Sequence, residues 1–456
     1  MNEQNFSTKV ADWLSEQQCH PLRYDLTEEL HARPFESLQT PADIFLFAKF
    51  TGEESRDNEF SHLQNFCQQH QLATPKVGVR HHRMYVGDDL IRWERHGEFT
   101  TFSLITSANS EQPFDAEVSS ILLDWMSNTE GQILVATQLS IREYNAEAHT
   151  EENVVKLFNR ASLVSSKLAS EEAQVWTDLR IHESGFNRIL LLNDKLRNRK
   201  LGRVAQRLMN ISTYRNLALL ALPIAQKASH ELADLDRQLS ILLDELSIPS
   251  DYTDIGGDRA SRIELDSKML RSLTALSMQI QSLSTQSRYR LSAADAYYAL
   301  INSRLTELNE TRVIGFQTIG EFLQRRLSPA MRTCTSVQGR LEDLSNRTSR
   351  AVDLLRTRLD LTLEHQNHSL LESMNKRVLA QMRLQQTVEG LSIAAITYYI
   401  ISLIGYLTKS TDGLASQLGL SISPEVITGL SVLPVGFLVW YSVRRIKRKI
   451  LEKTPN

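Results

Sequence analysis

The chain has 456 residues, of which 41% are apolar and 23% are charged, a composition typical of a folded protein of two or three structural units. Its formal net charge is −3, but segment 444–453 holds six basic residues and one acidic residue, which leaves 45 basic against 53 acidic side chains, or −8, in the rest. An acidic body with one short basic tail argues against a general nucleic-acid-binding protein.

Residues 1–195 are predicted to form an α/β domain. Short segments rich in β-branched and aromatic residues, each bounded by polar turns, predict a sheet of about six strands. These segments are Ala42–Phe50, Leu90–Ile105, Gln132–Ile141, Gln174–His182 and Gly185–Asn193. Helices are expected between them, over Phe60–Gln71 and Ala116–Met126.

Polar clusters lie on or beside these strands. Alternate residues of an extended segment share a face, so each of three sets is expected to point one way. The sets are Glu29, His31 and Arg33; Glu94, His96 and Glu98; and Trp176, Asp178, Arg180 and His182. Pro34 favours extended backbone at Arg33.

Two interpretations of these clusters remain open. Histidine with carboxylates can bind a transition metal or transfer protons. Glu–Arg and Asp–Arg pairs also make strong fixed contacts between strands and loops, and we favour this structural network. The sequence contains no phosphate-binding loop, no dinucleotide fingerprint, no Gly-x-Ser-x-Gly and no His-Glu-x-x-His, so no catalytic residue, cofactor or metal ligand is assigned.

Helical periodicity dominates residues 196–387. Apolar residues recur at spacings of three and four, which predicts a coiled coil or helical bundle. They include Leu273, Leu276, Ile280 and Leu283; Ile301, Leu305 and Leu308; and Val337, Leu341 and Leu344. Pro223 is expected to kink the first helix, Ser247–Ala260 to form a loop, and Pro329 to kink or interrupt the third helix.

The third helix is predicted to run from Pro329 directly into an apolar segment. At 1.5 Å per residue the part before that segment would be on the order of 85 Å long, and such a stalk needs helical partners. His365 and His368 on it are interpreted as solvated.

Two apolar segments, Val388–Leu407 and Ile422–Val443, are each long enough to span a bilayer and are expected to form a transmembrane hairpin. Tyr398, Tyr399 and Trp440 suit the membrane interface. The overall fold class is therefore α+β: a mixed α/β sheet domain, a long helical stalk, a two-helix hairpin over 388–443 and a basic tail over 444–456.

Basic residues flank both ends of the hairpin, which predicts that both termini face the cytoplasm. We expect the tail to set this topology and to contact anionic lipid. Its basic residues are Arg444, Arg445, Lys447, Arg448 and Lys449.

The first span carries a polar stripe at helical spacing, formed by Ser392, Tyr399, Ser402 and Tyr406. Helix–helix packing is the favoured interpretation, and a pore lining is the alternative.

The chain has three cysteines, Cys19, Cys67 and Cys334, far apart and without a Cys-x-x-Cys spacing. This pattern favours a reducing compartment over a disulfide framework or a structural zinc site. The N-terminus has no basic segment followed by an apolar core, so no signal peptide is predicted.

Several blocks resemble a bacterial family of predicted membrane-anchored proteins, domain of unknown function 3422. They include "HPLRYDLTEELHARPF", "WERHGEF", "VWTDLRIHESGFNRILLLN" and "GFQTIGEFLQRRLSPAMRTC". The resemblance covers nearly the whole chain and implies a membrane protein with no assigned activity. The matching motif residues are His20, Pro21, Glu29, His31, Arg33, Trp93, Glu94, His96, Trp176, Asp178, Arg180 and His182.

The layout is also similar to CorA-type magnesium channels, with a cytoplasmic α/β domain, stalk helices, two C-terminal spans and a basic tail. Those channels carry Gly-Met-Asn at the end of the first span, where this sequence reads "GYLTKST". The departure argues against cation selectivity of that kind, and fold alone does not fix function.

We therefore expect a non-enzymatic, multi-pass protein of the bacterial inner membrane that acts in scaffolding, assembly or sensing. An oligomeric ion channel or transporter is the alternative, and a membrane-tethered hydrolase comes third. The expected partners are membrane lipid and further copies of the chain through its helices. No nucleic acid and no cofactor are expected, and no small-molecule ligand is assigned.

Overall fold

The computed structural model describes residues 13–14, 20–24, 26–27, 35–51, 56–108, 110–247, 259–415 and 424–451. The chain divides into two compact units. Unit 1 comprises residues 1–253 and 271–352, and unit 2 comprises residues 254–270 and 353–456. Two long helices, α8 (Arg259–Leu308) and α9 (Ile319–Ala415), contribute residues to both units.

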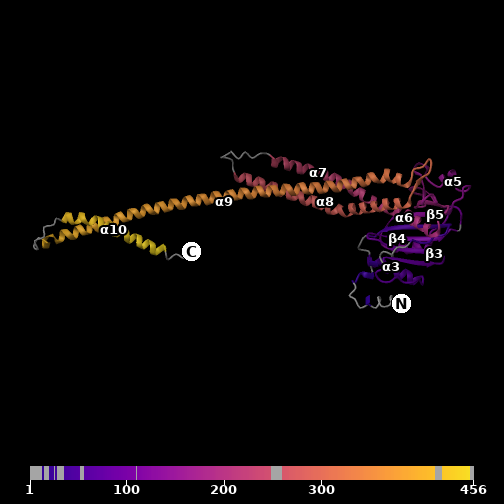
Figure 1. The fold of residues 1–456 in the computed structure, drawn as a ribbon, viewed down its shortest axis with the longest axis horizontal. Helices are drawn as coiled ribbons and strands as arrows, with labels where there is room; N and C mark the ends of the chain where they lie inside the picture. Colours follow the sequence, from indigo (N-terminus) through magenta and orange to yellow (C-terminus); the bar gives the residue numbers. More distant parts are fainter. Residues whose placement is uncertain are drawn as a thin grey trace, which may run out of the picture. The chain divides into compact units, whose positions relative to one another are not determined.

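The described part of unit 1 contains a nine-stranded sheet in the order β2-β3-β4-β1-β5-β8-β7-β6-β9. Figure 1 labels β3, β4 and β5 of this sheet. The neighbouring strands are antiparallel except β5 and β8, which are parallel. In chain order they are β1 (Ala42–Phe50), β2 (His81–Val86), β3 (Asp89–Arg95), β4 (Phe99–Ser107), β5 (Gln132–Glu143), β6 (Val164–Leu168), β7 (Ala173–Ile181), β8 (Asn187–Asn193) and β9 (Thr311–Arg312).

This sheet confirms the α/β prediction for the N-terminal part and is larger than the expected six or so strands. The single segment predicted over 90–105 is two strands, β3 and β4, joined by a turn at 96–98. The strands β2, β6 and β9 were not predicted from the sequence. Their sequences, "HHRMYV", "VSSKL" and "TR", are short or polar, and pairing with neighbours rather than local propensity makes them strands.

Strand β1, an inner strand of the sheet, is buried on both faces. Phe45 and Phe47 pack in a core with Leu63 of α3 (Arg56–Gln69) and with residues of α4 (Ser120–Ser127). The alternate position Ala48 packs in a second cluster with Leu217 of α6 (Asn198–Leu219). A strand covered on both faces reads as a near-continuous apolar run, which explains "IFLFA" in β1.

Helix α6 packs closely on the sheet of unit 1. The hydroxyl oxygens of Thr137 on β5 and Ser212 on α6 lie 2.8 Å apart. At Gly202 a built Cβ would lie 1.7 Å from the carbonyl oxygen of Glu36, so only glycine fits. The helix ends at Leu219, and α7 (Ala221–Ser247) carries Pro223 in its first turn, where a missing N–H costs little. The sequence predicted one helix with a kink at Pro223, whereas the structure has two helices that meet at Leu220.

Helices α7, α8 and the first part of α9 pack together in unit 1 (Figure 1). Arg347 on α9 forms an ion pair of 2.7 Å with Asp236 on α7. The hydroxyl of Thr335 on α9 donates to Asp295 on α8 at 3.4 Å. Most of the predicted periodic set on α8 and α9 is buried, and Leu305 is half-buried; the buried members are Leu273, Leu276, Ile280, Leu283, Ile301, Leu308, Val337, Leu341 and Leu344. Helix α9 continues through Pro329 without interruption.

Two helices are long and apolar enough to cross a membrane by length and composition. The apolar window of α9, within Ile319–Ser410, has a mean hydropathy of 1.7, and none of it is buried. The window within Glu425–Ile446 of α10 (Pro424–Leu451) has a mean hydropathy of 1.8 and is 6% buried. The prediction of two apolar C-terminal helices is confirmed, and α9 extends beyond the predicted span to Ala415.

Small residues bring α9 and α10 together within unit 2. A Cβ built at Gly405 would lie 3.5 Å from Cγ2 of Thr428, and one at Gly436 would lie 3.8 Å from Cγ2 of Thr397. Close approach at glycine and threonine is typical of helix pairs in membranes.

Candidate functional site

The cluster on β7 forms a fixed polar network around Asp178, whose side chain is almost fully buried. Its Oδ2 accepts from the backbone N–H of Asn159 at 2.8 Å, and its Oδ1 accepts from the backbone N–H of Arg180 at 3.1 Å. Nε2 of His182 lies 3.1 Å from Oδ2. The Arg180 side chain donates to Ser162 Oγ at 2.8 Å. Asp178 thus ties β7 to the segment before β6.

A bulge in β7 creates this arrangement. The pairing with β8 shifts between Thr177 and Ile181, so β7 carries two extra residues there. Leu179 in the bulge has a φ of +57°, an unfavourable conformation for a leucine. Bulges re-aim side chains and are common beside functional sites. Here the bulge sends Asp178 to the network and places Leu179 in the wall of a cavity.

The three residues of "WERHGEF" do not share one strand face, because β3 ends at Arg95. Glu94 pairs with Arg92 on its own strand. His96 stacks on Phe99, with ring centroids 4.1 Å apart. Glu98 lies in the turn between β3 and β4 and reaches a different partner set.

Glu98 binds residues of helix α8. Arg290 donates to both carboxylate oxygens of Glu98, at 2.8 Å to Oε1, and the hydroxyl of Tyr297 donates to Oε1 at 2.8 Å. Burial and this hydrogen bond raise the pKa of Tyr297 above its ordinary value of 10.0. The network fixes the β3–β4 turn to α8.

The set Glu29, His31 and Arg33 lies outside the described residues, so its expected contact with one of the other two clusters stays a prediction. Within the described ranges, no group of three or more His, Cys, Asp or Glu side chains could hold a metal ion.

The polar stripe of the first span is largely exposed. Ser392, Tyr399 and Tyr406 are exposed, and Ser402 is half-buried. Ser392 donates its hydroxyl to the Val388 carbonyl of its own helix at 2.8 Å. The helix contacts run instead through Gly405 and Gly436.

The basic residues after the second span continue helix α10, which ends at Leu451. Arg444 and Arg445 are exposed, and the guanidinium of Arg444 lies over the ring of Trp440, 4.9 Å from its centroid. Lys447, Arg448 and Lys449 belong to the same helix, and their side chains lie outside the described part of the structure.

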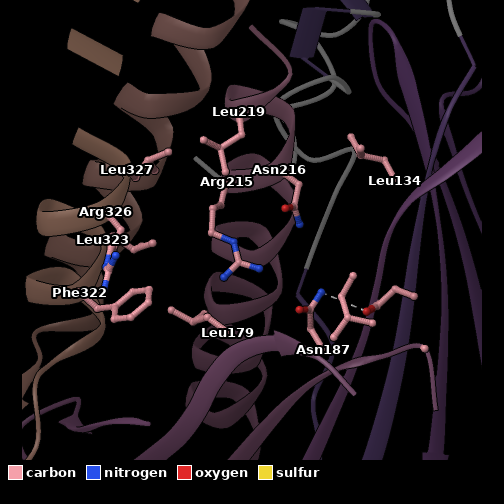
Figure 2. Close-up of a pocket in the computed structure, with 13 residues that line it drawn as sticks. Leu134, Leu179, Asn187, Arg215, Asn216, Leu219, Phe322, Leu323, Arg326 and Leu327 are labelled. Atoms are coloured by element: carbon pink, nitrogen blue, oxygen red, sulfur yellow. Dashed lines mark hydrogen bonds between the residues drawn. The ribbon is translucent and has the colours of Figure 1, made fainter. Parts of the chain in front are cut away.

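A cavity of about 320 Å³ lies at one end of the sheet in unit 1 (Figure 2). Strand β5 extends past β8 here, because its pairing with β8 starts at Thr137. Leu134 and Ala136 of this overhang form one wall, and Leu179 forms another. Helices α6 and α9 complete the cavity with Arg215, Asn216, Leu219, Phe322, Leu323, Arg326 and Leu327.

Arg215 dominates the chemistry of this cavity. Its residue surface is only 8% exposed, and burial lowers the pKa of its guanidinium to about 10. In the view of Figure 2 the guanidinium lies between the α9 side chains and that of Asn187, with Leu179 below it. No described residue accepts a hydrogen bond from it or pairs with it. The side chain is largely buried and its guanidinium opens onto the cavity, so a partner for it has to come from inside the cavity.

Sequence reasoning missed Arg215, although the sequence holds a signal. Three residues of α6 lie three or four positions from Arg215, namely Ile211, Ser212 and Leu219, and Leu208 lies one turn further on. Arg215 thus takes a core-facing position of a helix whose face is otherwise apolar or small. An arginine there needs a partner or a ligand.

Residues 18–450 match the family described as "Protein of unknown function (DUF3422)". The chain belongs to this family. Neither a curated protein nor a solved structure matches it. The family match agrees with the resemblance seen in the motif blocks, and the layout similarity to CorA-type channels gains no support from these comparisons.

Proposed function

We propose that this protein of the DUF3422 family is a non-enzymatic anchor protein of the bacterial inner membrane. Unit 1 would act in scaffolding, assembly or sensing in the cytoplasm. The observation that carries the proposal is the exposure of two apolar helices. None of the α9 window and 6% of the α10 window is buried, whereas a core helix of a soluble protein would be mostly covered. A bilayer removes such apolar surface from water.

Two further observations support a structural role for the polar clusters. The carboxylate of Asp178 is buried and accepts two backbone N–H groups, and that of Glu98 binds Arg290 and Tyr297. Polar groups whose hydrogen bonds are all satisfied by fixed partners make a fold rigid and stabilise it.

The test is extraction of membranes from cells that produce the full chain. We expect the chain to stay in the membrane pellet at alkaline pH and to dissolve only in detergent. A variant lacking residues 388–456 should appear in the soluble fraction. Release of the full chain by alkali would overturn the anchor, and ion flux through proteoliposomes of the purified chain would overturn the scaffold in favour of a channel.

A further inference from the structure

We propose that the cavity around Arg215 binds an organic anion with an apolar body, headed by a carboxylate or phosphate group. The site lies entirely within unit 1, so the proposal does not depend on membrane anchoring.

The charge of the cavity determines the sign of the charge on the ligand that it can bind. Arg215 and Arg326 both line it, and no Asp or Glu is among the described residues of its wall. Arg215 keeps its proton near neutral pH, because its lowered pKa is still about 10. A guanidinium presents a planar fork of donors that matches carboxylate and phosphate oxygens. A buried cation without a counter-ion is costly, and an anionic ligand supplies the missing partner.

The walls decide the body of the ligand. Leucine and phenylalanine side chains from β5, β7, α6 and α9 line the cavity beside the buried Arg215, and Arg326 lies exposed at its wall. These are Leu134, Leu179, Leu219, Phe322, Leu323 and Leu327. An apolar cavity of about 320 Å³ with a few convergent polar groups is typical of small-molecule sites. A fully hydrated inorganic ion would leave these walls unused.

A neighbouring cavity of about 340 Å³ adds to the positive charge. It shares Phe322 and Arg326 with the first and also carries Arg160 and Arg325, with Glu151 as an acidic residue of its wall. A ligand leaving the first cavity past Arg326 would therefore meet further guanidinium groups.

Calorimetric titration of the full chain in phosphatidylcholine nanodiscs tests the proposal. The probes are octanoate and octyl phosphate. Octanol is the control for the alkyl chain alone, and acetate is the control for the charge alone. We expect at least one of the two anions to bind the natural chain, and octanol and acetate to bind at least tenfold more weakly. Arg215→Met should weaken anion binding at least about tenfold, and Arg326→Gln about threefold or more. Arg237→Gln, an exposed arginine of α7, should bind like the natural chain.

Ligand-free stability separates a ligand-binding arginine from a structural one. If Arg215 gains a partner only when a ligand binds, Arg215→Met removes an unpaired buried charge from the ligand-free protein and raises its unfolding temperature, by roughly 2 °C. Ligand should then raise the unfolding temperature of the natural chain and leave that of the variant unchanged. Equal anion binding by natural chain and Arg215→Met, equal binding of octanol and the anions, or no binding of either anion at 10 mM would overturn the proposal. If Arg215→Met does not fold, Arg326→Gln decides.

A second arm distinguishes the source of the anion. Nanodiscs containing phosphatidylglycerol replace those of phosphatidylcholine. Weaker octanoate binding in these discs, with the difference lost in Arg215→Met, identifies a membrane lipid as the occupant. Unchanged binding identifies a water-soluble anion.

Discussion

Individual charged residues inside unit 1 hold its sheet together. Asp43 on β1 and Arg142 on β5 are both fully buried, and Nη2 of Arg142 donates to Oδ2 of Asp43 at 2.9 Å. Arg142 also donates to the backbone carbonyls of Ala42, Ile141 and Gln112. Nearly every donor of the guanidinium is used, in contrast to Arg215, which has no described partner.

Arg142→Met should therefore destabilise unit 1 strongly, because it leaves the Asp43 carboxylate buried without a counter-ion. We expect a loss of about 3–5 kcal/mol in the free energy of unfolding. Denaturant unfolding of the full chain in detergent, followed by tryptophan fluorescence, measures it. Lys156→Met is the matched control, since its pair with Glu152 is exposed and worth less than about 1 kcal/mol. Equal losses in the two variants would contradict the prediction.

The two described cysteines should resist thiol reagents. Cys67 and Cys334 are buried, and burial raises the pKa of both thiols above the ordinary value of 9.0. The thiolate is the reactive form, so a raised pKa leaves less of it at any pH below that value. In a Cys19→Ser variant we expect almost no modification by a disulfide reagent at pH 8 until denaturant is added. Rapid modification of the folded variant would show that one of these sites opens.

Raised thiol pKa values also link stability to pH. Above about pH 9 the thiols of the unfolded state lose their protons while those of the folded state keep them. The contribution of these thiols to the free energy of unfolding is therefore full below about pH 9 and declines as pH rises above it. Cys67→Ala should flatten this decline between pH 9 and pH 10.5, as measured by unfolding midpoints.

At the scale of elements, the contact between α6 and the chain segment before β1 sets the position of the helix. A Cβ at Gly202 would lie 1.7 Å from the Glu36 carbonyl oxygen, so the helix and that segment cannot both stay in place. Arg83 and Arg92 pair with the Glu36 side chain, which holds the segment from the other side.

Gly202→Ala should destabilise the protein by at least about 2 kcal/mol through this clash, although alanine is the better helix former. Gly339→Ala on α9 is the matched control, because a Cβ there has open space around it. We expect the control to gain about 0.5–1 kcal/mol from helix propensity. Thermal unfolding of both variants by circular dichroism checks the opposite signs, and a gain in both would refute the close approach at Gly202.

At the scale of the whole molecule, helix α9 is one continuous element from Ile319 to Ala415, with its first part in unit 1 and its apolar window in unit 2. Its first turn is fixed to the sheet of unit 1, because the backbone N–H of Ile319 donates to Ser166 Oγ at 3.1 Å. The chain that enters the proposed membrane segment is therefore the same helix that starts beside β6.

The orientation of that segment should depend on the basic end of α10. We expect unit 1 to be protected from protease in spheroplasts and cleaved in inverted membrane vesicles. Replacing Arg444, Arg445, Lys447, Arg448 and Lys449 by glutamine should give a mixed orientation, because the charge bias that retains this end in the cytoplasm falls. Replacing the exposed Glu151, Glu152 and Lys156 by glutamine instead, far from the hairpin in the sequence, should leave the orientation uniform. Full protection of both forms in inverted vesicles would reverse the proposed topology.

Several features of this protein are determined locally and can be predicted from its sequence. The apolar runs of the two C-terminal helices and the three-and-four spacing of Leu273 to Leu283 each depend on residues close together in the chain. Strands with β-branched and aromatic residues, such as β1 and β8, are equally legible.

Only the tertiary structure decides the rest, because it depends on contacts between residues far apart in the chain. The strands β2, β6 and β9 exist through pairing across the sheet. The alternation of residues in an extended strand predicted that Glu98 shares a face with Glu94. In the structure β3 ends at Arg95, and Glu98 in the following turn binds Arg290, 192 residues away in the chain. The cavity around Arg215 needs a bulge in β7, an overhang of β5 and two helices, and no local pattern encodes their meeting.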